Sequence, residues 1–240
     1  MSWVITGSEK VARDPYLYTN TVLLLKGDGT NGSTTILDSS KVAGSPKTVT
    51  AVGNAQISTA QSKFGGSSIA FDGNGDGLNV TKTADFDFGT ADFTIESWVY
   101  FSSGDFKIID AFKGYSLNTS GNYFDLLVNS SRYIRFATSV GASFLALTAT
   151  DQQMSINTWH HVAASKASGT VRLFVNGVQA ATTGSLSSTI NGGTVRINVG
   201  YTEEFNDNYL NGYIDDLRIT KGIARYTANF TPPTAPFPDI

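Results

Sequence analysis

The sequence predicts an all-β fold, a two-sheet antiparallel β-sandwich, and three observations support this prediction. Residues 159–183 contain three short segments in which apolar and polar side chains alternate with a period of two, the pattern of half-buried strands. Asn176-Gly177 joins two of these segments and is a strong hairpin signal, because both residues tolerate the positive φ of a type I′ turn. No other segment has the period of a long amphipathic helix, so a second sheet is expected to cover the apolar face of this meander.

The predicted strands N-terminal to the meander are short and are separated by turns rich in Gly, Asp and Asn. Residues 22–25 form an uninterrupted apolar run, which is typical of a strand covered on both faces. Residues 93–101 form the longest candidate and carry bulky side chains on both faces, so we expect this strand to lie centrally, with Trp98 and Trp159 largely buried. The other candidates are residues 48–52, 69–71, 78–80, 108–112, 123–128, 133–137 and 144–147.

The two ends of the chain differ from the strand-rich middle. Residues 194–199 and 209–220 are the last predicted strands. The tail, residues 231–240, contains prolines that cannot donate in a central strand, so it should lie over a surface or an edge. Residues 1–18 show no clear periodicity and form a lead-in, which leaves residues 19–240 as one predicted domain.

Composition excludes several classes of protein. Charged residues make up 15% of the chain, its net charge is −3, and Lys and Arg are scattered, so we expect no nucleic-acid partner. The absence of cysteine excludes disulfides and thiolate metal sites. No apolar run reaches the length of about 18 residues that spans a bilayer, and no signal peptide is apparent, so we expect synthesis in a cytoplasm and no membrane insertion.

Five segments occur in an order that is similar to a known family. They are KFGGSSIAFDGNGDGLNV, ADFTIESWVYF, NTWHHVAAS, RLFVNGVQ and LNGYIDDLRITKGIARYTANFTPP. Between Asp14 and Pro236 the chain resembles the laminin-G-like, concanavalin-A-like jelly-roll domains, in the variant common in bacteriophage structural proteins. The resemblance implies a jelly roll of the kind used by lectins and some glycanases, located in a virion on a tail, fibre or capsid. Residues 1–18 would then serve as a lead-in or virion-attachment segment.

The chain does not have the residue pattern expected of a glycanase or a Ser-His-Asp enzyme. Glycanases of this superfamily use paired acids along one strand face, but Glu96 has no acidic neighbour two residues away. His160 and His161 are adjacent on a strand, so they face opposite sides of the sheet and cannot form one site. We therefore expect no enzymatic activity.

Calcium is the expected cofactor. The chain has sixteen aspartates and four glutamates, and short carboxylates beside Gly in loops suit an oxygen-rich cation site, although many of these loops are also ordinary turns. Asp215 shares strand parity with Tyr213, Leu217 and Ile219, an apolar face on which a bare carboxylate is costly unless paired or metal-bound. The resemblance implies a calcium site near the first and last strands. Its ligands would be Asp28, Asp38, Asp215 and Asp216.

Carbohydrate binding is the expected activity, because aromatic rings stack on the apolar face of a sugar while amides and carboxylates bind its hydroxyls. The candidates are the loop residues Tyr115 and Asn118, and Tyr201, Asn206 and Asp207. The preferred function is a non-enzymatic virion module that binds cell-surface glycans or adheres to other virion structural proteins, with homo-oligomers among its assemblies. The alternatives are a purely structural decoration protein without a sugar site and a polysaccharide-degrading enzyme.

Overall fold

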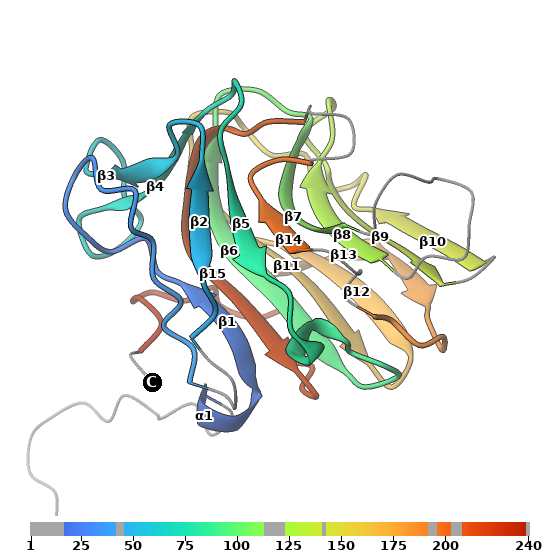
Figure 1. Ribbon diagram of the computed structural model, residues 1–240. Coiled ribbons are helices and arrows are strands. Elements are labelled where there is room, and N and C mark those ends of the chain that lie inside the picture. The colour runs from blue at the N-terminus through green and yellow to red at the C-terminus, as the bar shows by residue number, and fades with distance from the viewer. Residues whose placement is uncertain are drawn as a thin grey trace, which may run out of the picture.

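The computed structural model describes most of the chain as two antiparallel sheets packed face to face (Figure 1). The described residues are 17–41, 46–112, 123–140, 143–191, 196–202 and 208–238. Sheet A has eight strands in the order β13-β12-β11-β6-β15-β4-β3, with β1 also paired to β15, and sheet B has seven in the order β10-β9-β8-β7-β14-β5-β2. The predicted β-sandwich is therefore confirmed.

The strands agree closely with the segments of period two. The strands of sheet A are β1 (Thr21–Leu25), β3 (Gln56–Ser58), β4 (Ser68–Asp72), β6 (Phe93–Phe101), β11 (His160–Ala167), β12 (Thr170–Val175), β13 (Val178–Ser185) and β15 (Asn211–Lys221). Those of sheet B are β2 (Val49–Val52), β5 (Gly77–Thr81), β7 (Phe106–Phe112), β8 (Tyr123–Val128), β9 (Ile134–Val140), β10 (Ser143–Thr148) and β14 (Arg196–Val199). The helical elements of the described residues are α1 (Leu17–Asn20) and the 3-10 turn η1 (Ala84–Phe86), and neither approaches the length that a membrane-crossing helix needs.

Phenylalanine rings from both sheets fill the space between them. Phe93 of β6 stacks on Phe88 with ring centroids 4.7 Å apart, and Phe88 stacks on Phe124 of β8 at 4.9 Å. Phe93 also contacts Phe136 of β9 at 5.7 Å. Each of these side chains is almost fully buried, so aromatic packing between β6 and the facing strands of sheet B forms the centre of the core. The prediction that residues 93–101 form a central strand is confirmed.

The hairpin at Asn176-Gly177 has the predicted geometry. Asn176 has φ of +50° and Gly177 has φ of +78°, as a type I′ turn requires. A Cβ on Gly177 would lie too close to the carbonyl oxygen of Phe230, so the turn also accommodates the C-terminal segment. The amide N–H of Phe230 donates to the carbonyl of Gly177 at 2.9 Å.

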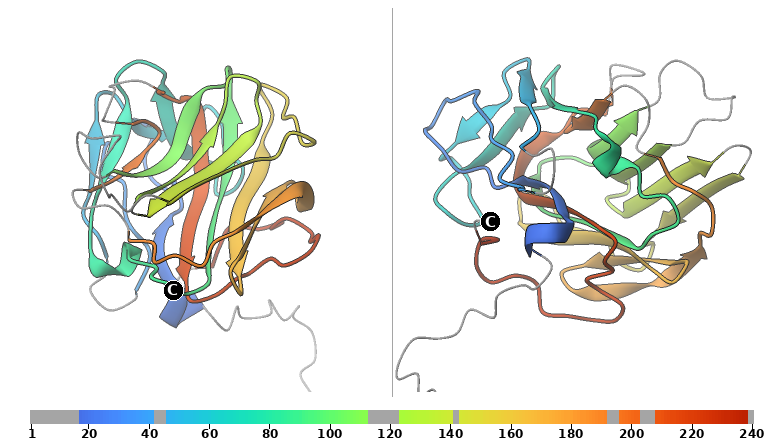
Figure 2. Two further views of the ribbon diagram at one scale, coloured as in Figure 1. Left: turned by 90° about the vertical axis from the view of Figure 1, so that its right-hand side faces the viewer. Right: turned by 60° about the horizontal axis from the view of Figure 1, so that its bottom comes forward.

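Residues 222–238, here called the C-terminal segment, pack on the outer face of sheet A. Tyr226 and Phe230 stack on each other with centroids 3.6 Å apart, and both rings meet Phe174 of β12 edge-on. Figure 2 shows this red segment running along the outside of the layer that holds β11 and β12. In the proline-rich tail itself, the amide N–H of Phe237 donates to Asp216 and its buried ring contacts Arg218, so the prediction that the tail lies over a surface is confirmed for its described residues.

A β-bulge in β15 corrects the parity argument made for Asp215. The register between β15 and β6 shifts between Asp215 and Arg218, and Asp216 has φ of +50°. Asp215 lies opposite Trp98 on the outer face, whereas Leu217, beyond the bulge, is buried in the core. Asp215 therefore does not share a face with Leu217 or Ile219, because the extra residue reverses the alternation.

Candidate functional site

Three half-buried aromatic side chains lie next to one another on the outer face of sheet A. Tyr100 of β6 points outward because its neighbours Val99 and Phe101 both point into the core. Its ring lies 5.7 Å from the ring of Tyr213, the residue opposite it on β15, and 5.7 Å from the ring of Trp159, which immediately precedes β11. We call these three residues the aromatic row.

The aromatic row continues and is bordered by hydrogen-bonding groups. Ala70 of β4 lies opposite Tyr213, and its small side chain leaves room above the sheet. Gln56 of β3 lies opposite Ala70, and the side chains of Ala70 and Gln56 are both partly exposed. Two residues further along the strands, three exposed polar side chains lie on the same outer face. These are Asp72, Asn211 and Ser102, here called the polar row.

The loop between β3 and β4, which contains Lys63 and Phe64, lies on the side of the aromatic row opposite the polar row. Phe64 meets the ring of Trp98 edge-on at 5.9 Å, and the Lys63 ammonium lies 3.9 Å from the centroid of the same ring. The carboxylate of Asp215 accepts the backbone N–H groups of Lys63 at 2.8 Å and of Phe64 at 3.1 Å. Burial raises the pKa of Asp215 to about 6, although these two hydrogen bonds oppose the rise. Asp215 thus fastens the loop beside the aromatic row.

Trp98 and Trp159 differ in burial although both lie on this face. Trp98 is 6% exposed under the loop, as predicted. Trp159 is more exposed than Trp98, because its side chain is half-buried, although its indole nitrogen is enclosed.

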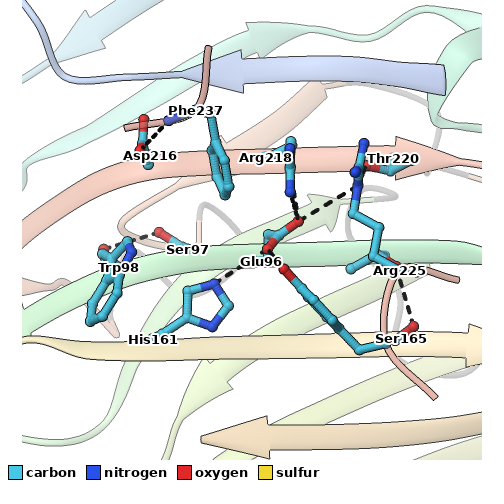
Figure 3. A network of polar contacts seen from close by, with 12 residues as sticks. Glu96, Ser97, Trp98, His161, Ser165, Asp216, Arg218, Thr220, Arg225 and Phe237 are labelled. Carbon is cyan, nitrogen blue, oxygen red and sulfur yellow. Dashed lines mark hydrogen bonds and ion pairs between the residues drawn. The ribbon is translucent and has the colours of Figure 1, made fainter. Parts of the chain in front are cut away.

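Glu96 is fully buried on the same face and is surrounded by cationic and hydroxyl groups (Figure 3). Its Oε1 lies 2.7 Å from Nη2 of Arg218 and 3.8 Å from Nε of Arg225, and its Oε2 accepts the hydroxyl of Tyr226 at 2.6 Å. His161 Nε2 lies 3.3 Å from Oε2. Burial by itself would raise the pKa of Glu96, but Arg218, His161 and Arg225 together hold it well below its usual range. Glu96 thus anchors the C-terminal segment.

A second set of polar side chains lies on the outer face of sheet B. Asn198 of β14, Asp110 of β7 and Asp125 of β8 are neighbours across adjacent strands, and each is at most 5% exposed. Lys107 Nζ lies 2.5 Å from Asp125 Oδ2, and Thr202 donates its hydroxyl to Asp110. None of the described residues forms a hydrogen bond with the side-chain amide of Asn198. A search for acids two residues apart on one strand misses the Asp110–Asp125 pair, because its members come from different strands.

Asp38, one of the predicted calcium ligands, uses both carboxylate oxygens for hydrogen bonds to nearby donors. Oδ1 accepts the backbone N–H groups of Leu24 at 3.0 Å and of Ser40 at 2.9 Å. Oδ2 accepts the Ser40 hydroxyl and the backbone N–H of Lys47, each at 2.8 Å. This carboxylate therefore links β1 to the segment before β2.

The other three predicted calcium ligands influence one another. The charge of Asp28 contributes to the raised pKa of Asp215, and Asp28 also lies 3.2 Å from the Lys26 ammonium. Burial raises the pKa of Asp216 to about 7, opposed by its hydrogen bond from the Phe237 backbone N–H and reinforced by Asp215. Within the described part of the chain, no three acidic or histidine side chains are arranged as a metal site. Calcium binding stays a prediction.

Most of the predicted carbohydrate-binding residues lie outside the described residues. These are Tyr115, Asn118, Asn206 and Asp207. The fifth, Tyr201, is 4% exposed, stacks on Tyr209 and donates its hydroxyl to Asn79 Oδ1 at 2.6 Å, so it is used in packing. The sequence analysis did not predict the aromatic row. The alternation of side chains in residues 93–101, which places Tyr100 on the outer face, was the one sequence pattern that pointed to it.

Comparisons with known proteins agree with this architecture. Residues 72–224, more than half of the chain, match the family model described as the concanavalin A-like lectin/glucanases superfamily. No curated protein matches the chain.

Three similar solved structures illustrate the range of relatives. The binding domain of Paraclostridial Mosquitocidal Protein 1 is 16% identical with a TM-score of 0.61, and the match covers 84% of this chain and 49% of that one. The receptor-binding domain of botulinum neurotoxin D is 16% identical with a TM-score of 0.61, covering 85% and 50%. Domain 4 of AbnA, a GH43 extracellular arabinanase from Geobacillus stearothermophilus in complex with arabinotriose, is 17% identical with a TM-score of 0.60, covering 86% and 95%. The chain thus spans about half the length of the two toxin domains, and identities this low show similarity of fold alone.

Proposed function

The chain belongs to the concanavalin A-like lectin/glucanases superfamily, and from this premise we propose that it is a non-enzymatic glycan-binding module of a bacteriophage virion. The observation that supports this function is the aromatic row formed by Tyr213, Tyr100 and Trp159. Partly exposed rings side by side on a rigid sheet offer a stacking surface for the apolar faces of successive sugar rings. We assign glycan binding to this row.

The polar row supplies the groups that would distinguish one sugar from another. Asp72 accepts hydrogen bonds, whereas Asn211 and Ser102 both donate and accept, so together they complement the hydroxyls of a stacked pyranose. All three are exposed and are therefore accessible to a ligand without any rearrangement of the sheet. The outer face of sheet B is less suitable, since Asn198, Asp110 and Asp125 are buried there.

The virion assignment and the lack of catalysis are supported by separate observations. The order of the five sequence segments resembles that of phage structural proteins. Glu96, the acid of the long central strand, is enclosed by Arg218 and Tyr226, so it has no access to a substrate. A purely structural decoration protein is the alternative, and it differs from the proposal in having no affinity for glycans.

A glycan array followed by titration tests this function. The full chain should bind a subset of glycans. Tyr213→Ala and Trp159→Ala should each raise the dissociation constant for the best oligosaccharide at least about tenfold, which is a loss of about 1.4 kcal/mol in binding free energy. Tyr213→Phe keeps the ring and should keep most of the affinity. Tyr133→Ala removes a half-buried tyrosine in the turn after β8 and serves as the control. An array without any bound glycan, with and without millimolar calcium, would favour the structural alternative.

A further inference from the structure

Two edge strands lie side by side at one flank of the sandwich. β10 is the last strand of sheet B and β13 is the last strand of sheet A, and both lie on the same side of the molecule in Figure 1. Leu145 and Leu147 of β10 pack against Gly184 of β13, where a Cβ would lie within 3.0 Å of both leucine side chains. At this flank the two sheets therefore pack directly against each other, and each sheet ends there in an edge strand.

The two edge strands of this flank contain no charged residue of their own. Residues 136–150, which contain β10, and residues 173–195, which contain β13, include no Asp, Glu, Lys, Arg or His, although charged residues make up 15% of the whole chain. Natural proteins commonly place charges, prolines or covering segments on exposed strand edges, because unpaired backbone groups otherwise pair with another chain.

The other long or accessible edges have such protection, whereas no described residue provides it for β10. The Gly32 and Ser33 backbone groups bond to Ile57 and cover the outer edge of β3. On β13, Asn229 and Asp151 accept the outward N–H groups of Gln179 and Ala181. β2, a further edge strand, has only four residues.

β10 instead combines an open edge with an apolar surface. It is six residues long, SFLALT, and in the described part of the chain no side chain caps its free edge. Phe144 on its outer face is 59% exposed, and Ala146 beside it is also exposed. Burying this edge against another strand would satisfy its backbone groups and remove the phenyl ring from water.

We propose that β10 is the contact strand of a symmetric dimer, in which it pairs antiparallel with β10 of a second copy and joins the two copies of sheet B. A second copy is the favoured partner because a two-fold axis brings identical surfaces together, and β10, which has no charged residue, meets its own copy without repulsion between its side chains. A two-fold axis through Leu145 keeps outward residues opposite outward residues and places each Phe144 against the small Ala146 of the other copy. If the aromatic row binds glycans as proposed, the dimer carries two such rows and gains avidity on a multivalent surface.

Sedimentation velocity with the full chain at about 1 to 100 µM tests the dimer directly. The unmodified chain should sediment as a dimer that dissociates on dilution. Phe144→Lys and Ala146→Lys place like charges at the contact and should raise the dimer dissociation constant at least tenfold. Leu37→Lys is the matched control, because Leu37 is 70% exposed between β1 and β2 and lies away from the flank. Circular dichroism establishes that each variant is folded.

The lack of cysteine permits a second test that does not depend on disrupting the contact. Ala146→Cys should form covalent dimers with a short bis-maleimide reagent, whereas Leu37→Cys should not. A monomer at about 100 µM overturns the proposal. So does a dimer that persists in both lysine variants, or equal cross-linking at the two cysteine positions, because the contact would then lie elsewhere. None of these outcomes bears on glycan binding, which the array measures separately.

Discussion

Glu96 and Arg218 form a buried ion pair between β6 and β15, with Arg218 Nη2 2.7 Å and Nε 2.9 Å from Glu96 Oε1. The Glu96 side chain is fully buried and that of Arg218 is 5% exposed, so neither charge has an alternative partner in solvent. The same carboxylate binds Tyr226, and the pair therefore connects two central strands of sheet A to the C-terminal segment (Figure 3).

Removing the charge of Glu96 should destabilise the fold strongly. Glu96→Gln leaves Arg218 without its counter-ion in a buried site, which typically costs about 3–5 kcal/mol. Urea denaturation followed by fluorescence measures this loss. Asp105→Asn, at an exposed acidic position, is the control and should change stability by less than about 0.5 kcal/mol. A loss below about 1 kcal/mol for Glu96→Gln would contradict the anchoring role.

Stability should fall as the pH rises from about 4 to about 7. Asp215 and Asp216 have folded-state pKa values of about 6 and about 7, above the ordinary aspartate value of 3.8, so the folded state binds more protons than the unfolded state in this window. Glu96 acts in the opposite sense, but its lowered pKa affects stability only below about pH 4.5. His160, whose pKa is lowered from 6.5 by burial, also opposes the fall below about pH 6.5, but two carboxyl groups act against this one imidazole.

Denaturation at several pH values measures this slope. Asp216→Asn should flatten it and should stabilise the chain at pH 7.5, by at most about 4 kcal/mol, the equivalent of the pKa difference of Asp216. A stability that rises steadily between pH 5 and pH 7.5 would show that these carboxyl groups are charged in the folded state without cost.

Calcium should raise the melting temperature at pH 7.5 and have less effect at pH 5, because protons compete for Asp215 and Asp216. At about 100 times the dissociation constant the stabilisation would be about 2.7 kcal/mol. Asp215→Asn should remove the calcium response. Asp38→Asn should lower stability but keep the response, because the Asp38 oxygens already accept hydrogen bonds from Leu24, Ser40 and Lys47. Identical melting curves in chelator and in millimolar calcium would refute the site.

The two outer-face tryptophans should respond differently to truncation. Trp98→Ala removes a ring enclosed by Phe64, Lys63 and His161 and should cost about 3–5 kcal/mol. Trp159→Ala removes a half-buried ring and should cost clearly less, roughly 1–2 kcal/mol, while weakening glycan binding. Chemical denaturation of both variants measures the difference, and equal losses would place Trp159 in the core after all.

Polysaccharide hydrolysis should be undetectable. Reducing-sugar assays on host envelope glycans measure it directly, with Glu96→Gln and Asp125→Asn as companion variants. Activity lost only in Asp125→Asn would identify the Asp110–Asp125 pair on sheet B as catalytic and would overturn the non-enzymatic proposal.

Local patterns were sufficient to predict most of the fold from the sequence. The alternation at 159–183, the Asn176-Gly177 turn and the apolar run at 22–25 each reflect chain geometry over a few residues, and each corresponds to an observed element. Whether a segment forms a strand depends on such short-range periodicity. The two-sheet sandwich could therefore be predicted from the order of these segments together with the lack of a helical period.

The site depended on information that a single segment does not contain. Tyr100, Tyr213 and Trp159 become neighbours only through the register of β15 on β6 and of β6 on β11, and register is a property of strand pairs. The bulge at Asp216 reversed the parity assumed for Asp215, because one inserted residue exchanges the faces of everything beyond it. Local sequence patterns are therefore enough to predict strands and turns, but the side chains that share a surface follow only from the pairing of strands that lie far apart in the chain.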